Sequence, residues 1–220
     1  MTNKETALRE IYSRMADRYG PRHWWPAKTP FEVCVGAILT QNTAWNNVEK
    51  AIAGLESAGV LTPEGLRDIE PDQLALLIRP SGYFNLKSRR LKEFVGWFYS
   101  HYEGELERMF AGAWHILRDE LLSVRGIGPE TCDSILLYAG GKPTFVVDSY
   151  TRRLFHRLGY LSADANYEEI RRMFMENLSA DAVLFNEYHA LIVEQCKQFC
   201  RKRPCCNSCP LVESCSYNVQ

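Results

Sequence analysis

The strongest local signal in this sequence is Leu122-Ser123-Val124-Arg125-Gly126-Ile127-Gly128-Pro129-Glu130-Thr131. Two glycines separated by one residue allow a tight turn whose backbone N–H groups are exposed. Pro129 stands where a new helix would begin, because the first helical position needs no N–H donor. These residues fit an ordinary helical hairpin. They also fit a hairpin whose second helix points its positive end at a bound anion.

Helical patterns surround this hairpin. Its two arms are predicted at residues 113–123 and 129–139. Apolar residues at helical spacing predict further helices over about 4–19, 30–39, 45–58, 71–79, 87–101, 148–158, 166–178 and 181–199. No alternating strand pattern or internal repeat is present. The sequence therefore predicts an all-α fold.

The composition is that of a globular chain. The 220 residues are 46% hydrophobic and 24% charged, which argues against disorder. The longest apolar stretch, around 33–39, is far below the ~20 residues of a membrane helix. The charged start, MTNKETALRE, has no apolar h-region, so we expect no secretory signal. The apolar pattern and the charged start argue against a membrane or secreted protein, and a cytoplasmic location is expected.

The charges are balanced overall but locally clustered. The net charge of −1 neither supports nor excludes a nucleic-acid partner. Two segments hold cations without any acid: residues 149–158, with Arg152, Arg153, His156 and Arg157, and residues 196–206, with Lys197, Arg201, Lys202 and Arg203. Each cluster is either a solvated helix face or part of a positive binding surface.

The cysteines concentrate at the C-terminal end. Six of the eight lie between Cys196 and Cys215, which indicates a metal site more than a disulfide framework. The spacing Cys200-x5-Cys206-x2-Cys209-x5-Cys215 leaves two alternatives, an iron–sulfur cluster or zinc. Cys205 competes with Cys206 as a ligand, but only Cys206 leaves two residues before Cys209.

The chain resembles a known family at several separate motifs. Beside the hairpin and its Thr131, Val146-Val147-Asp148, the helix Gly36–Asn42 that ends near Gln41, the segment Ser81–Lys87 and the cysteine tail are together similar to the helix-hairpin-helix DNA glycosylases of the endonuclease III superfamily. The resemblance covers roughly residues 25–215. The usual first cysteine spacing of that family is x6, one longer than here.

The resemblance implies a fold and a set of roles. It implies two helical lobes, one over 30–142 with the helix-hairpin-helix at about 113–139, and one joining 1–29 to 143–220 with a [4Fe–4S] loop at 200–215. Asp148, which on its own would be read as a helix N-cap, becomes the catalytic carboxylate. Cys200, Cys206, Cys209 and Cys215 become the cluster ligands. DNA contacts are expected from Gln41, Gly126, Gly128, Thr131, Arg152, Arg153, Arg201 and Lys202.

Two further features narrow the expected reaction. Bifunctional members of the superfamily carry a lysine where this sequence has Glu130, and a carboxylate cannot form an imine, so no AP lyase activity is expected. Trp24, Trp25 and Trp45 resemble the pocket of the 3-methyladenine DNA glycosylase branch, where aromatic faces stack on a cationic alkylated purine. Glu130 is also expected in this substrate pocket. The alternative is that these three tryptophans are ordinary residues of the hydrophobic core.

The sequence thus predicts a base-excision-repair DNA glycosylase. It is expected to act as a monomer on damaged double-stranded DNA, near the nucleoid, and to release alkylated purines. The alternatives are an endonuclease III-like enzyme for oxidised pyrimidines or for uracil and thymine mismatches, and a non-catalytic DNA-binding lesion sensor.

Overall fold

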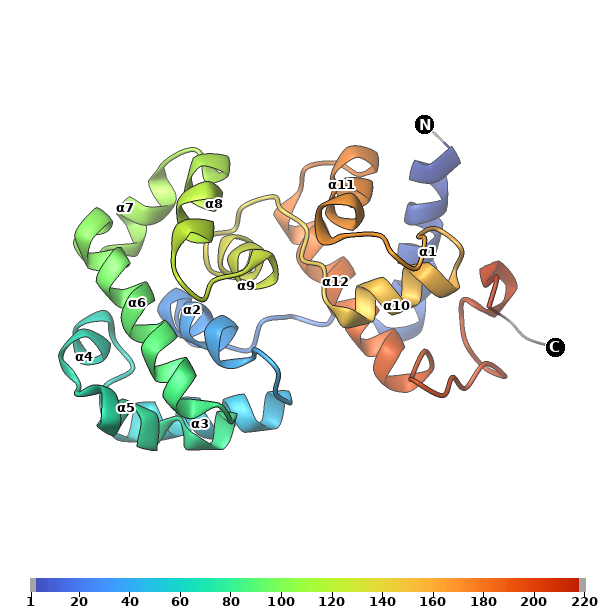
Figure 1. The fold of residues 1–220 in the computed structure, drawn as a ribbon. Helices are drawn as coiled ribbons and strands as arrows, with labels where there is room; N and C mark the ends of the chain where they lie inside the picture. Colours follow the sequence, from blue (N-terminus) through green and yellow to red (C-terminus); the bar gives the residue numbers. More distant parts are fainter. Residues whose placement is uncertain (1–2, 218–220) are drawn as a thin grey trace. The chain divides into compact units, whose positions relative to one another are not determined.

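The computed structural model describes residues 3–217, and within them every regular element is helical, as the sequence predicts (Figure 1). The chain divides into two compact units. One is Trp25–Gly140, and the other joins Met1–Trp24 to Gly141–Gln220. The unit Trp25–Gly140 is therefore one continuous segment, and the other unit is built from the segments before and after it. The sequence placed the corresponding boundaries near residues 30 and 142.

The unit Trp25–Gly140 holds the helices α2 to α9. They are α2 (Pro30–Leu39), α3 (Trp45–Ser57), α4 (Pro63–Asp68), α5 (Pro71–Leu77), α6 (Phe84–Tyr102), α7 (Leu106–Ala111), α8 (Trp114–Ser123) and α9 (Pro129–Ser134). α2 is the centre of the unit, because every residue from Val33 to Leu39 is buried. Proline at the first position and the Thr29 side chain, which accepts from the Glu32 amide, fix where α2 begins.

The other unit holds α1 and α10 to α12. They are α1 (Asn3–Tyr19), α10 (Ser149–Arg157), α11 (Tyr167–Asn177) and α12 (Ala182–Gln198). Its core is aromatic: Phe145 stacks on Phe174 with ring centroids 3.7 Å apart, and the fully buried Tyr188 meets both rings edge-on. Between α12 and residue 217, the last one described, the one regular element is a short 3₁₀ turn, Val212–Ser214.

Three elements differ from the sequence prediction. The six-residue helices α4 and α7 were not predicted, because about one and a half turns carry too little periodicity to be recognised. Residues 129–139 were predicted as one α-helix, but α9 ends at Ser134 and continues as a π-helical turn, Ile135–Ala139. Such turns often lie near functional sites.

None of the helices in residues 3–217 is long and apolar enough to cross a membrane.

Candidate active site

The predicted hairpin forms a short, rigid turn. Gly126 has φ +94°, and a Cβ there would lie 2.5 Å from Cγ of Arg90 on α6. Both the conformation and the close approach therefore require glycine. Ile127, only 5% exposed, packs into the core of its unit, and its amide donates to the Val124 carbonyl. Ile127 thereby anchors the turn to the core, and Gly128 is the N-cap of α9.

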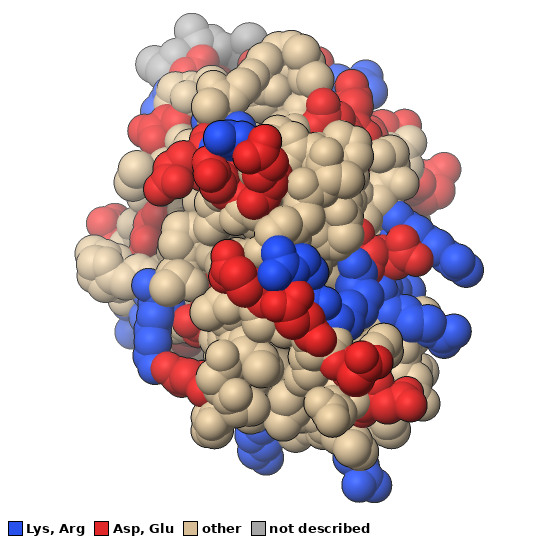
Figure 2. Space-filling view, turned by 90° about the vertical axis from the view of Figure 1, so that its left-hand side faces the viewer, with Lys and Arg blue, Asp and Glu red and all other residues tan. Residues whose placement is uncertain are grey.

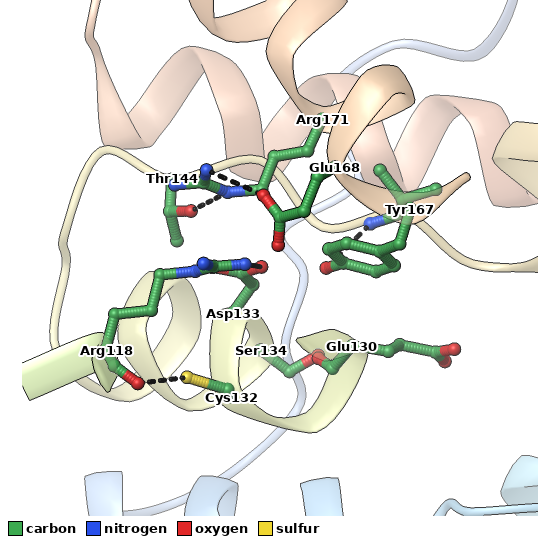
Figure 3. Close-up of polar contacts among 10 residues, drawn as sticks. Arg118, Glu130, Cys132, Asp133, Ser134, Thr144, Tyr167, Glu168 and Arg171 are labelled. Atoms are coloured by element: carbon green, nitrogen blue, oxygen red, sulfur yellow. Dashed lines mark hydrogen bonds and ion pairs between the residues drawn. The ribbon is translucent and has the colours of Figure 1, made fainter. Parts of the chain in front are cut away.

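A buried ion pair joins the two arms of the hairpin. Nε and Nη2 of Arg118 on α8 donate to the two carboxylate oxygens of Asp133 on α9, at 2.9 and 3.0 Å. Asp133 is fully buried. Cys132 donates to the Arg118 carbonyl beside this pair, and the Ser134 hydroxyl donates to the Glu130 carbonyl (Figure 3). A two-point Arg–carboxylate contact fixes orientation as well as distance, so the angle between the arms is well defined.

Gln41 is bonded directly to the hairpin. Its Nε2 donates to the Gly126 carbonyl at 3.0 Å and to the Thr131 hydroxyl at 2.9 Å, while Arg90 donates to its Oε1. Gln41, Gly126 and Thr131, three of the predicted DNA-contacting residues, therefore form one cluster. The role of Arg90 was not predicted, since a cationic residue within a basic run gives no sign of its partner.

A buried lysine supports the loop that carries Gln41. Lys87 is only 1% exposed, and its Nζ donates to the carbonyls of Leu39 and Ser81 at 2.8 and 2.7 Å. It thus caps the C-terminal end of α2 immediately before Gln41. Burial, with a smaller effect of Arg90, lowers the pKa of Lys87 to about 8.

Two of the three predicted pocket tryptophans lie together. The rings of Trp25 and Trp45 meet edge to face, 4.9 Å between centroids, and the centroid of the Tyr138 ring lies 5.2 Å from that of Trp25. Gly36 leaves room for Trp25, because a Cβ there would be 3.1 Å from the indole. Trp24 belongs to the other unit, with Asp148.

The tryptophan pair borders an acidic cavity of about 180 Å³. Glu49 accepts from Nε1 of Trp45 at 2.9 Å, which sets the orientation of that indole. Glu32 and Glu56 also line the cavity, and Lys28 is hydrogen-bonded to Glu56. Sequence reasoning missed Glu49, although its i+4 position after Trp45 on one helix was visible. Glu130, in the first turn of α9, does not line this cavity.

Asp148 is the N-cap of α10 and is mostly buried, with 14% of its side chain exposed. Its Oδ1 accepts from the amide of Thr151 at 2.7 Å and from its hydroxyl at 2.9 Å. Nε2 of His189, on α12, lies 3.6 Å from Oδ2. Burial acts to raise the pKa of Asp148, but attraction to His189 and the bonds from Thr151 outweigh it, so the pKa lies below its ordinary value of 3.8. His189, 41 positions away in the sequence, was not predicted.

The segment before Asp148 is held against α11. Nε of Arg171 donates to the Thr144 hydroxyl at 2.9 Å (Figure 3). The Val147 amide lies 3.4 Å from the Tyr167 hydroxyl. Thr144 to Val147 are all buried. The backbone on the N-terminal side of Asp148 is therefore as constrained as the helix on its other side.

The arginines that were predicted to contact DNA form hydrogen bonds within the protein. Arg152 donates to the Ala165 carbonyl, and Nε of Arg153 donates to the Cys200 carbonyl at 2.8 Å. Nε of Arg201 donates to the Lys197 carbonyl, while the Arg201 and Lys202 side chains are exposed. Arg153 therefore links α10 to the start of the cysteine loop.

The four predicted ligand cysteines border one cavity. Cys200, Cys206, Cys209 and Cys215 line it together with Cys205, Arg157 and Gln195. Arg157 lies 3.3 Å from the Cys200 sulfur and also donates to the carbonyls of Arg201 and Lys202, while Gln195 lies 3.0 Å from the Cys209 sulfur. A hydrogen bond from Cys196, together with Arg157, lowers the pKa of the Cys200 thiol.

Five cysteines border this cavity, and four thiolates are the number that an iron–sulfur cluster needs. Across residues 3–217, however, no three His, Cys, Asp or Glu side chains converge as a metal-binding group. Cys205 is exposed and Cys206 is half-buried, and both line this cavity.

Comparison with known proteins identifies the family. Residues 35–180 match the family model of the HhH-GPD superfamily of base excision DNA repair proteins. The chain is 48% identical, over 97% of both chains, to the Methanocaldococcus jannaschii protein named "Putative DNA repair glycosylase MJ1434". It is 28% identical to endonuclease III of Sulfolobus acidocaldarius, covering 85% of this chain and 82% of that one.

Solved structures of DNA glycosylases share the fold of this chain. The Helicobacter pylori 3-methyladenine DNA glycosylase MagIII, bound to 1,N6-ethenoadenine, superposes with a TM-score of 0.78 and 29% identity, over 90% of this chain and 98% of that one. An endonuclease III–DNA complex has a TM-score of 0.83 at 23% identity, covering 99% and 97% of the two chains, and shows the shared fold.

The protein is a helix-hairpin-helix DNA repair enzyme. More specifically, it belongs to the HhH-GPD superfamily, as a DNA glycosylase that binds DNA.

Proposed function

We propose that this glycosylase is monofunctional and releases alkylated purines such as 3-methyladenine. The observation that carries the proposal is the cavity bordered by Trp25 and Trp45, with Glu49 bonded to Trp45. Electron-rich aromatic faces attract a cationic ring, and a nearby carboxylate strengthens that attraction. N-alkylation gives a purine this positive charge and also activates it as a leaving group. The 29% identical MagIII is a 3-methyladenine glycosylase, which supports the same substrate class here.

Asp148 is proposed as the catalytic carboxylate. A base can be excised only after its nucleotide leaves the stack. Breaking the glycosidic bond develops positive charge on the sugar, which an ionised carboxylate stabilises while it orients the attacking water. The lowered pKa keeps Asp148 ionised at neutral pH. Oδ1 is engaged by Thr151, so Oδ2, on the side of His189, is the oxygen proposed to act.

The absence of lyase activity rests on Glu130. This residue occupies the first turn of α9, where bifunctional relatives are expected to carry a lysine. Its carboxylate supplies no amine for a Schiff base, so water is the proposed nucleophile and the strand stays intact.

DNA is proposed to be held by the hairpin and by the basic loop around Arg201 and Lys202. The backbone amide of the exposed Gly128 is proposed to donate to a phosphate of the DNA. Gln41 is proposed to fill the gap left by the extruded base, and to do so it must give up its bonds to Gly126 and Thr131.

A [4Fe–4S] cluster is proposed at Cys200, Cys206, Cys209 and Cys215, because these thiols border one cavity. The cluster would supply a covalent cross-link that fixes the loop carrying Arg201 and Lys202.

A panel of duplexes, each with one altered base, tests the proposal. Release of 3-methyladenine or another alkylated purine, with strand breakage only after alkali, is expected. Strand cleavage without alkali, or release only from oxidised pyrimidines or mismatches, would favour the endonuclease III-like alternative. Binding without release from any duplex would favour a lesion sensor.

A further inference from the structure

A second basic groove lies beside the hairpin, within the unit Trp25–Gly140. It has a volume of about 620 Å³ and runs between one face of α6 and residues 123–125 at the end of α8. Arg89, Lys92 and Glu93 on α6 and Arg125 on the hairpin contribute its charged side chains. None of these residues belongs to the contacts proposed above.

Two of the cations are available to a ligand. Arg89 and Arg125 are exposed, and neither guanidinium is engaged in an ion pair or hydrogen bond within residues 3–217. Lys92 instead donates to the carbonyls of Arg67 and Ile69. Glu93 is the one acidic side chain among the groove-lining residues. The groove is therefore net positive in a chain of net charge −1. In the space-filling view, the largest group of Lys and Arg side chains lies toward the right of the face drawn, with acidic residues beside it and further Lys and Arg side chains at the other edges (Figure 2).

The floor of the groove is kept open by a glycine. Gly96 lies inside the 19-residue helix α6, and a Cβ at this position would meet no atom within 4 Å. Neither packing nor a positive φ requires glycine here, although glycine is a poor helix former. An occupant that lies against the helix backbone would explain the residue. Trp97, half-buried, forms an aromatic wall next to it.

The groove is continuous with the hairpin turn. Arg125 immediately precedes Gly126, and the turn rests on Arg90, the neighbour of Arg89 on α6. A polyanion held at the turn therefore has an adjoining surface of opposite charge along which to continue.

We propose that this groove binds the DNA backbone beyond the hairpin, with Arg89 and Arg125 each contacting a phosphate. The contact is independent of sequence and of the damaged base. It extends the DNA footprint on the side of α6, and it would anchor the enzyme while it searches undamaged duplex.

The test uses the 220-residue chain as purified, with whatever cluster it carries, and an undamaged 30-base-pair duplex. The slope of log affinity against log salt concentration is measured for wild type and for Arg89→Ala/Arg125→Ala. Each lost phosphate contact lowers the magnitude of the slope by about 0.9, so the double variant is expected to lose about 1.8.

A matched variant removes the same net charge elsewhere in the unit. Arg67 and Arg108 are exposed and paired with Asp68 and with Glu103 and Glu105, so Arg67→Ala/Arg108→Ala is expected to leave the slope unchanged. Glu93→Gln should tighten binding. Gly96→Glu should weaken binding strongly, and Gly96→Ala should weaken it less, because even a single Cβ would stand between the helix backbone and the occupant.

Equal slopes for the wild type and Arg89→Ala/Arg125→Ala, or an equal loss in the matched variant, would overturn the proposal. The readout is binding to undamaged DNA, so it does not depend on which base the enzyme excises. Failure of the alkylated-purine proposal would appear instead in the base-release panel.

Discussion

Replacing Asp148 by Asn and by Ala separates its two roles, because each replacement removes a different part of the side chain. Oδ1 caps α10 through the amide and hydroxyl of Thr151, and an asparagine oxygen caps a helix as well as aspartate does. Asp148→Asn keeps the cap but loses the attraction to His189, so it should lower the free energy of unfolding by less than Asp148→Ala does. Asp148→Ala loses the cap and should cost about 1 kcal/mol.

Both variants lack the negative charge beside the sugar. A positioned acid or base contributes about 10²- to 10⁴-fold to rate, or about 3–5 kcal/mol of transition-state stabilisation. Single-turnover release of an alkylated base should slow by that factor in both variants, while DNA binding is retained. Urea unfolding measures stability on the same preparations.

Two results would refute this reasoning. Near wild-type base release by Asp148→Asn would assign the chemistry to another group. Equal destabilisation of the two variants would show that the cap is not what the aspartate contributes to folding.

Four other outcomes are expected. Cys206→Ser should lose the brown colour of the purified protein and destabilise the unit that carries the loop; wild-type protein containing zinc and no iron would contradict this assignment. Borohydride should not trap the wild-type protein on damaged DNA, whereas Glu130→Lys should yield some trapped complex by proximity; efficient trapping of wild type would require a lysine elsewhere, with Lys142 the first to test. His189→Ala removes an attraction that lowers the pKa of Asp148, so the acid limb of the kcat/KM profile should move to higher pH; an unmoved limb would exclude that coupling. Lys87→Met leaves two buried carbonyls without their donor and should lower the free energy of unfolding by about 3 kcal/mol in urea titrations; a change below 1 kcal/mol would contradict its role as a cap.

The helices could be predicted wherever local signals agree. Pro30 and the apolar run that follows define α2, and Pro129 after two glycines defines the start of α9. The short helices α4 and α7 and the π-helical turn at Ile135 could not be predicted. Their hydrogen bonding is decided by tertiary packing, which a short sequence window does not contain.

The residues of the candidate site could likewise be predicted in part from the sequence. The resemblance to the helix-hairpin-helix DNA glycosylases identified Asp148 and Gln41 as candidates, and the spacing of the cysteines indicated a metal site. The contacts that would make them function depend on residues distant in the sequence, such as His189 beside Asp148 and Arg90 beside Gln41. A single histidine or arginine carries no local mark of its partner, so only the folded structure shows these pairs.

The most direct test of the account is one reaction of the wild-type protein with methylated duplex DNA, divided into two samples. Chromatography of the first identifies any free base, and a denaturing gel of the second, without alkali, reports the integrity of the strand. We expect 3-methyladenine in the first sample and intact strands in the second. Cleaved strands, or no free alkylated base from an enzyme that does release an oxidised or mismatched pyrimidine, would contradict the account.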